Sequence, residues 1–303
     1  MKQRISIICT IVMMVLLVFG CGPKQLGTTG ATHQVTDGTG TVVTVPTEPK
    51  HIVPIAASTE DIVLSLVDPS RVAAVGTVPN NVPDASAKVE KHVKASAESM
   101  LSVQPDLVLV PNWMSPDAIG EMRNMQIPVY VYKTPTTVKE AKATIHEIAG
   151  LLHASDASMI ASMDADLKTV EELTNKHSGE RPLVAFYSQF GLTGGKGSTF
   201  DDMCNYLKVN NAAAQIGLGP FDNGTREDLI KSNPDIIFIP SVAYTSDGTT
   251  PATAEQLYSD PALQGVKAIA NRRVYLVDSS QVMSYSQFMT RAMVSMAQNI
   301  YSM

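Results

Sequence analysis

Two stretches of the chain share one pattern of polar and apolar positions. Residues 97–111 align with residues 226–240 at a constant offset of 129. Each stretch predicts a short helix opened by a capping residue, Ser96 or Thr225, and stopped by proline. A Pro-Asp pair and a run of apolar residues follow, which is the pattern of a buried strand. Repetition at about half the chain length predicts two similar lobes.

Strands and helices also alternate in each half. Residues 51–56 predict a strand that leads into a helix at 59–67, and residues 183–187 predict a strand that leads, after a Gly-rich turn, into a helix at 199–207. This alternation is typical of parallel sheets in the α/β class. About 270 residues follow the first 34, which suits two domains better than one.

The two halves are joined by residues rich in helix formers and free of proline. Residues 137–176 predict two helices, the second at about 157–176. At 1.5 Å per residue this second helix spans roughly 30 Å, enough to cross from one lobe to the other. The predicted domains are an N-terminal α/β lobe at 35–153, an interlobe helix at 154–178 and a C-terminal α/β lobe at 179–303.

The N-terminus reads as an export signal. Two basic residues precede an uncharged and mainly apolar run, residues 5–19, that ends just before Cys21. The run is shorter than the roughly 20 residues of a membrane-spanning helix, so residues 1–20 are predicted to be a signal peptide. The end of the run resembles a bacterial lipobox, which implies lipidation of Cys21 and a flexible tether at 21–34. An uncleaved anchor helix is the alternative.

Composition narrows the class of protein. Of three cysteines, only Cys204 lies in the predicted lobes, so no disulfide forms within them, and this residue is expected to be buried. A net charge of −6 argues against nucleic acid or an anionic membrane surface as a partner. The six histidines are scattered, which disfavours a bare metal ion as ligand and predicts no resident metal or cofactor.

Several short motifs occur in order between about residues 35 and 278. They are Val35-Thr36-Asp37-Gly38, His51-Ile52-Val53, Ser58-Thr59-Glu60-Asp61, the stretch from Gly194 to Phe200, and Leu257-Tyr258-Ser259-Asp260-Pro261. Together they resemble the binding proteins that deliver iron-siderophores, haem or cobalamin to ABC importers. The resemblance implies two α/β lobes joined by one rigid helix, a ligand cleft between the lobes, and only modest closure.

A pair of glutamates is the sharpest functional expectation. Glu98 and Glu227 occupy equivalent places in the first turns of the two repeated helices. The resemblance implies that each docks with arginines of the membrane permease, through charge-assisted contacts that set the docking register. The alternative is helix-dipole chemistry, because acids are favoured in the first turn of any helix.

The cleft is expected to present aromatic faces to a bulky chelate. His92 and Phe221 each lie six residues before the glutamate of their lobe, and both are expected to face the cleft. Trp113, at a strand end, and Phe190 are further candidates, with core packing the alternative for Phe190. A bystander role is the alternative to haem ligation by His92.

Basic residues would meet an anionic siderophore. Lys196 and Arg226 are the main candidates for the cleft and Lys133 is a weaker one, with an ordinary surface position as the alternative for each. The expected function is capture of an iron-siderophore or haem and its delivery to a permease. A cobalamin-binding protein is the alternative within the family, and a bare-metal binding protein is a further one.

No motif of an enzyme stands out. The Gly-rich stretch at 191–198 lacks the spacing of a phosphate-binding loop. The chain contains neither a Gly-x-Ser-x-Gly elbow nor a His-Glu-x-x-His zinc helix. The protein is therefore expected not to be an enzyme, an extracytoplasmic hydrolase being the remaining alternative.

Overall fold

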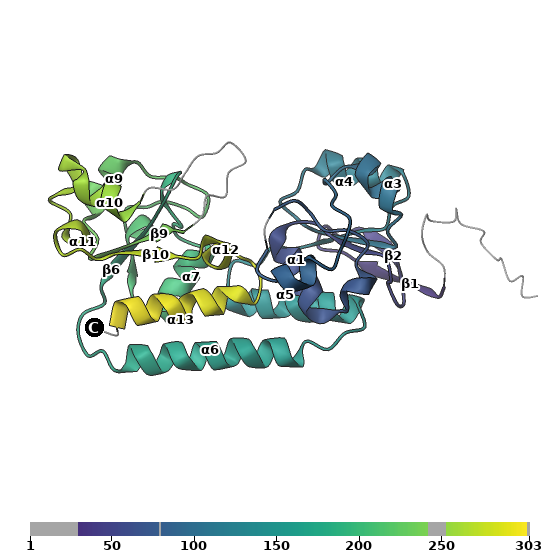
Figure 1. Ribbon diagram of the computed structural model, residues 1–303, viewed down its shortest axis with the longest axis horizontal. Coiled ribbons are helices and arrows are strands. Elements are labelled where there is room, and N and C mark those ends of the chain that lie inside the picture. The colour runs from purple at the N-terminus through teal and green to yellow at the C-terminus, as the bar shows by residue number, and fades with distance from the viewer. Residues whose placement is uncertain (1–29, 79, 242–252, 302–303) are drawn as a thin grey trace, which may run out of the picture.

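The computed structural model describes residues 30–78, 80–241 and 253–301. Two α/β lobes stand side by side on a base of long helices (Figure 1). The predicted fold class, with mainly parallel sheets in two lobes, is confirmed. None of the helices in the described ranges is long and apolar enough to cross a membrane. The predicted signal peptide and Cys21 lie outside these ranges.

The N-terminal lobe contains a parallel sheet in the order β3-β4-β5 and a separate hairpin of β1 and β2. Its strands are β1 (Thr32–Thr36), β2 (Val42–Pro46), β3 (Ile52–Pro54), β4 (Leu107–Pro111) and β5 (Val129–Tyr132). Its helices are α1 (Ala57–Leu66), the 3-10 turn Pro69–Arg71, α2 (Pro83–Ser86), α3 (Ala97–Val103), α4 (Pro116–Asn124) and α5 (Val138–Leu151).

The C-terminal lobe contains a five-stranded sheet in the order β10-β9-β6-β7, with β8 also paired to β6. Its strands are β6 (Leu183–Ser188), β7 (Gly191–Thr193), β8 (Asn210–Asn211), β9 (Ile236–Pro240) and β10 (Val274–Val277). Its helices are α7 (Thr199–Tyr206), α8 (Ala212–Gln215), α9 (Arg226–Ser232), α10 (Ala254–Ser259), the 3-10 turn Pro261–Leu263, α11 (Lys267–Ala270), α12 (Ser279–Val282) and α13 (Phe288–Tyr301). Only β7 is antiparallel to its neighbour.

The sequence repeat is also a structural repeat. Helices α3 and α9 end on Gln104 and Asn233, two matched residues that both adopt the left-handed conformation with φ 47°. The aspartate of each Pro-Asp pair then fixes the start of a neighbouring strand. Asp106 accepts hydrogen bonds from the backbone N–H of Lys50 and His51, and Asp235 accepts one from Leu183. The strands that follow, β4 and β9, are buried along their whole length.

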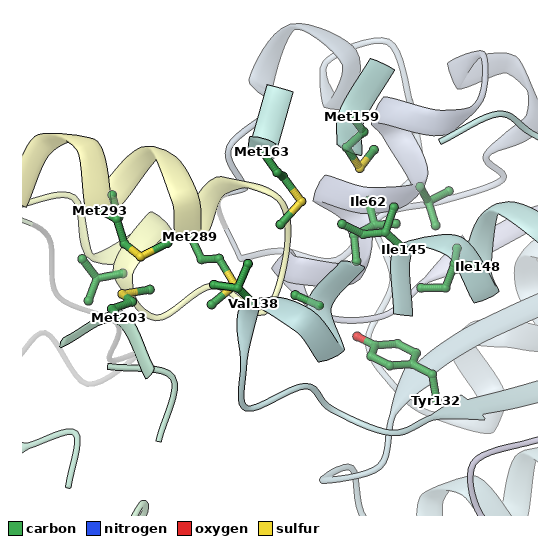
Figure 2. Close-up of a cluster of buried hydrophobic side chains, with 14 of the residues drawn as sticks. Ile62, Tyr132, Val138, Ile145, Ile148, Met159, Met163, Met203, Met289 and Met293 are labelled. Atoms are coloured by element: carbon green, nitrogen blue, oxygen red, sulfur yellow. The ribbon is translucent and has the colours of Figure 1, made fainter. Parts of the chain in front are cut away.

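The chain passes from one lobe to the other through α6 (Ala157–Asn175), close to the predicted interlobe helix. The C-terminal helix α13 packs against α6 beneath the lobes (Figure 1). Side chains from both lobes meet these helices in one continuous apolar cluster (Figure 2). The cluster includes Ile62 and Ile145 of the N-terminal lobe, Met163 of α6, Met203 of α7 and Met289 of α13. The lobes therefore share a core, and Cys204 is buried in it as predicted.

The first strand corrects the predicted tether. Strand β1 begins at Thr32, so residues 32–34 belong to the folded lobe. Thr32 pairs with Pro46 and His33 with Val45 across the hairpin. The Gly- and Thr-rich composition of this segment favoured a flexible tether. The strand forms because it pairs with β2, and composition alone does not predict such pairing.

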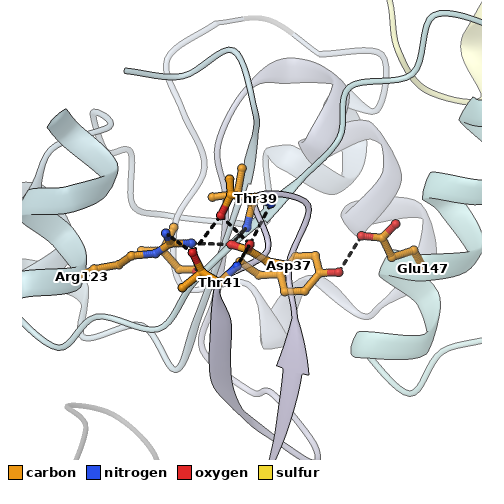
Figure 3. A network of polar contacts seen from close by, with 8 residues as sticks. Asp37, Thr39, Thr41, Arg123 and Glu147 are labelled. Atoms are coloured by element: carbon orange, nitrogen blue, oxygen red, sulfur yellow. Dashed lines mark hydrogen bonds and ion pairs between the residues drawn. The ribbon is translucent and has the colours of Figure 1, made fainter. Parts of the chain in front are cut away.

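A buried aspartate ties this hairpin to the lobe (Figure 3). Asp37 accepts hydrogen bonds from Thr39, from the backbone N–H of Thr41 and from that of Val131, and it forms an ion pair with Arg123. Burial by itself raises the pKa of Asp37, but the hydrogen bonds from Thr39, Thr41 and Val131 outweigh it and lower the pKa below 3.8. The ionised carboxylate is therefore the form that the fold favours.

Replacing this carboxylate tests its contribution. We expect Asp37→Asn to lower the free energy of unfolding by about 1–3 kcal/mol at pH 7, because buried donors lose a charged acceptor. A lowered pKa means that this stability is present above about pH 4 and is lost as the pH falls through the folded-state pKa. Urea unfolding at pH 7, 5 and 3.5 should therefore show a constant deficit that shrinks only at the lowest pH. Asp117→Asn, at an exposed position, is the control and should change little; a deficit that persists unchanged at the lowest pH would contradict the assignment.

Candidate ligand-binding cleft

A cavity of about 790 Å³ lies between the two lobes. In the N-terminal lobe its walls are the segments that follow β3, β4 and β5, including Ser58, Trp113 and Thr134. Carboxyl ends of parallel strands meet at one edge of a sheet, which is where α/β proteins commonly hold ligands. The C-terminal lobe contributes the β6–β7 turn, the start of α7, residues 220–223, and residues 280–285 except 281.

Three of the predicted aromatic residues line this cavity. Trp113 comes from the N-terminal lobe, and Phe190 and Phe221 come from the C-terminal lobe. Their exposed fractions are 59%, 49% and 85%. Phe190 therefore does not pack in the core, which was the alternative for it. Large apolar surfaces left open inside a cavity are suited to contact with the face of a bulky ligand.

Two loops of the C-terminal lobe are held together so that their aromatics share one wall. Leu192, just after Phe190, exchanges two backbone hydrogen bonds with Gly224, just after the loop of Phe221; their N···O distances are 3.0 and 2.7 Å. Gly191 makes this approach possible, because a Cβ there would lie 2.1 Å from the carbonyl oxygen of Gly224. The position of both aromatics thus depends on backbone pairing between distant segments.

The sequence indicates only part of the remaining apolar wall. Residues 283–288, near the end of the last predicted strand, are expected at the border of the cleft, but nothing in the sequence pointed to Phe186 and Phe200. Phe186 and Phe200 stack on each other, with ring centroids 5.5 Å apart, and both also line the cavity. Met283 and Tyr285 contribute from the segment that follows α12. Burial raises the pKa of Tyr285, so its hydroxyl stays protonated. Sequence offered one signal for this segment, its place directly after the last predicted strand.

The cavity wall carries little charge. Among the described lining residues the basic one is Lys133, whose side chain is 71% exposed and lies 3.5 Å from Glu140. The acidic one is Asp222, which accepts a hydrogen bond from the backbone N–H of Gly219. The other polar lining residues are hydroxyl and amide side chains, such as Asn112 and Thr136. Within the described ranges no three His, Cys, Asp or Glu residues gather to hold a metal ion.

The other three predicted cleft residues are not part of this lining. His92 borders a smaller cavity of about 420 Å³, formed within the N-terminal lobe by residues between 76 and 92. Lys196 is exposed on the turn before α7. Arg226 binds Asp260, with an N···O distance of 2.8 Å. The offset of six residues from the glutamates thus predicted the place of Phe221 but not that of His92.

The two predicted docking glutamates are both exposed in first helical turns. Glu98 lies in α3, whose first turn is capped by Ser96, and Glu227 lies in α9, capped by Thr225. Helices α3 and α9 occupy the edge of the molecule opposite α6, one on each lobe (Figure 1). A flat partner could therefore touch both helices at once while leaving the base free.

Comparison with known proteins agrees with this architecture. Residues 52–281 match the family model described as periplasmic binding protein. The chain belongs to the periplasmic binding protein family. This family consists of solute-binding proteins of ABC transporters, so the predicted family and the expectation that the chain is not an enzyme are confirmed. It also makes the chain an extracytoplasmic binding protein.

Three relatives illustrate the range of the family. The "Uncharacterized ABC transporter substrate-binding lipoprotein YvrC" of Bacillus subtilis is 27% identical over 99% of this chain and 98% of that protein. A "Cobalamin-binding protein" of Halobacterium salinarum is 22% identical over 86% of this chain and 72% of that protein. The periplasmic haem-binding protein RhuT from Roseiflexus sp. RS-1 has the same fold, with a TM-score of 0.71 and 19% identity over 84% of this chain and 98% of that chain.

Proposed function

We propose that this protein is the lipid-anchored receptor of an ABC importer and that it captures a large metal chelate of little net charge, a corrinoid fitting best. The observation that carries the proposal is the cavity between the lobes. It combines exposed aromatic faces from both lobes, Trp113 on one side and Phe190 and Phe221 on the other, with an almost uncharged wall. A flat, bulky ligand that enters from the open edge would meet both aromatic sets.

Charge argues against strongly anionic chelates. A ferric catecholate carries several negative charges and needs several arginines or lysines around it. The described lining offers Lys133 alone, and Glu140 stands beside it. Such a ligand would lose its hydration without gaining enough compensating charge.

Haem is also a weaker fit. Its iron takes axial ligands such as His, Cys, Met or deprotonated Tyr. The described lining holds Met283 and Tyr285 as candidates, and burial raises the pKa of Tyr285, which disfavours the deprotonated form. Haem also carries two carboxylates, and the described lining offers only Lys133 to pair with them.

A corrinoid suits the polar part of the wall. Its ring is surrounded by amides, which pair with hydroxyl and amide side chains such as Ser58, Asn112 and Thr136. Helix α1 begins at the cavity edge, and its N-cap residue Ala56 provides no side-chain cap. The free backbone N–H groups there suit an anionic group such as the phosphate of a nucleotide side arm. A neutral ferric hydroxamate is the second candidate, because it satisfies the charge argument without using the flat aromatic faces.

A ligand panel tests the proposal. Trp113 is the one tryptophan of the chain, so quenching of its fluorescence reports occupation of the cavity. We expect cyanocobalamin to bind more tightly than a ferric hydroxamate, and haemin and a ferric catecholate to bind at least about tenfold more weakly, a difference of about 1.4 kcal/mol. Phe221→Ala should weaken cyanocobalamin binding by about 10–100-fold, because the aromatic surface that the ligand would cover is lost.

The matched control is Tyr206→Ala, which removes an exposed aromatic that does not line the cavity. This variant should bind with unchanged affinity. Tighter binding of the ferric catecholate than of cyanocobalamin, or no binding of any neutral chelate, would contradict the proposed ligand class.

Lipidation at Cys21 is the proposed anchor. The support is the apolar run that ends just before this cysteine, together with the name of the Bacillus relative, which describes that protein as a lipoprotein. We expect the wild-type protein in the membrane fraction and Cys21→Ser partly released from it on export, because the acyl chains supply the attachment. A Cys21→Ser protein that stays fully with the membrane would indicate the uncleaved anchor helix instead.

Docking through the paired glutamates is the proposed delivery step. We expect Glu98→Gln combined with Glu227→Gln to leave cyanocobalamin affinity unchanged and to reduce uptake by at least about tenfold, because two charge-assisted contacts worth about 1.5–3 kcal/mol each are lost. The measurement is uptake of labelled cyanocobalamin by cells that express the matching importer. The control is Asp117→Asn combined with Glu255→Gln, two exposed first-turn acids on other helices. Equal loss of uptake in both double variants would favour a helix-dipole role.

A further inference from the structure

Two adjacent carboxylates at the start of α1 are almost completely buried, and ligand capture as described above does not use them. Glu60 and Asp61 are each 1% exposed. They belong to the Ser58-Thr59-Glu60-Asp61 motif, whose first residue lines the cavity. Buried carboxylates require donors, and each of these two accepts hydrogen bonds from the loop that follows residue 75.

Glu60 makes its side-chain hydrogen bonds within the N-terminal lobe. Its Oε1 accepts a hydrogen bond of 2.7 Å from the backbone N–H of Gly76, and its Oε2 accepts one of 2.7 Å from Asn80 Nδ2. A Cβ at Gly76 would lie 2.9 Å from Glu60 Oε1, so glycine allows this close approach. Both partners belong to the same lobe as Glu60.

Asp61 makes hydrogen bonds with residues of both lobes. Its Oδ1 accepts a hydrogen bond of 2.7 Å from the backbone N–H of Asn81, and its Oδ2 accepts one of 2.8 Å from Asn81 Nδ2. The same Oδ2 also accepts a hydrogen bond of 3.1 Å from Ser286 Oγ in the C-terminal lobe. In addition, Gln287 Nε2 donates to the backbone carbonyl oxygen of Asp61 at 3.0 Å.

Asn81 adds a second set of contacts across the same boundary. Its Nδ2 donates to the backbone oxygen of Ser280 at 3.0 Å, and its Oδ1 accepts from Ser280 Oγ at 2.7 Å. Asp61, Asn81, Ser280 and Ser286 thus form one network, in which two members come from each lobe. Between the two serines lie Met283 and Tyr285, which line the cavity.

We propose that Asp61 and Asn81 form an interlobe latch that holds residues 280–286 against α1 and so positions Met283 and Tyr285 in the cleft. The latch fixes the spacing of the lobes at the inner end of the cavity, above the shared core. It rests on contacts that exist without any ligand, so it stands independently of which chelate the protein binds.

The chemistry of Asp61 suits this role. Burial raises the pKa of Asp61, and the hydrogen bonds from Asn81 and Ser286 oppose that rise. The ionised carboxylate therefore depends on the latch being closed. Separation of residue 286 from α1 would remove one of its donors, and buried charge without donors is unfavourable.

Neighbouring asparagines provide a matched test. Asn81→Ala removes the side-chain contacts across the lobes. Asn80→Ala removes the hydrogen bond to Glu60 and the one accepted from the backbone N–H of Val82, both within the N-terminal lobe. Hydrogen–deuterium exchange is measured on the ligand-free protein. In Asn81→Ala we expect the peptide covering residues 280–288 to exchange about tenfold faster, because the hydrogen bonds between Asn81 and Ser280 are lost. In Asn80→Ala that peptide should exchange as in the wild type.

Ser286→Ala is the second variant, because it removes a latch contact without touching the loop of Asn81. It should accelerate exchange of the same peptide. Unchanged exchange in both latch variants, or equal acceleration in Asn80→Ala, would overturn the proposal.

Affinity for cyanocobalamin gives the functional readout. We expect Asn81→Ala to weaken it about tenfold while Asn80→Ala leaves it unchanged; equal affinities in the two variants would overturn the positioning role. If the wild-type protein does not bind cyanocobalamin, the proposed ligand class fails, and the exchange measurement alone decides on the latch.

Discussion

The architecture depends on one apolar core that both lobes share. Met163 of α6 and Met289 of α13 lie in the same cluster as Ile62 of the N-terminal lobe and Met203 of the C-terminal lobe. Any wide separation of the lobes would expose this cluster to water, at about 1.5–3 kcal/mol for each large side chain uncovered. The cleft above the core is therefore largely preformed, and small adjustments of its walls are the movements that the packing permits.

Because the cleft is largely preformed, the residues that line it determine which ligand binds. The two lobes provide equivalent scaffolds, since α3 with β4 and α9 with β9 repeat each other down to the left-handed residues Gln104 and Asn233. The segments that enter the cavity do not repeat. Trp113 enters from the segment after β4, whereas Phe190 and Phe221 enter from loops held together by the Leu192–Gly224 pairing. The two lobes are thus alike at the outer edge, where Glu98 and Glu227 lie, and differ in the segments that line the cavity.

Polar contacts join the two lobes at the inner end of the cavity. Asp61 and Asn81 bind residues 280 and 286 of the opposite lobe at the point where the shared core ends. Apolar packing is non-directional and resists separation of the lobes, whereas hydrogen bonds fix one registry between them. Together the two kinds of contact explain how a single connecting helix is sufficient for a defined cleft.

The sequence by itself determined the elements and their repetition. Capping residues, prolines and apolar runs act over a few positions, so the bounds of α3, α9 and α6 were readable, and so were the two lobes. Trp113 was recognisable from its place at a strand end and Phe221 from its place six residues before Glu227, whereas for Phe190 core packing stayed open as the alternative.

The tertiary structure decided which side chains meet. His92 lies at a separate cavity, Arg226 is taken by Asp260, and β1 extends into the predicted tether, because each of these outcomes depends on a partner far away in the chain. The contacts of Asp61 are of the same kind, since residues 61 and 286 are brought together only by folding. Local pattern fixes the conformation of a segment; the direction of a side chain and the identity of its neighbours are set by how the segments pack.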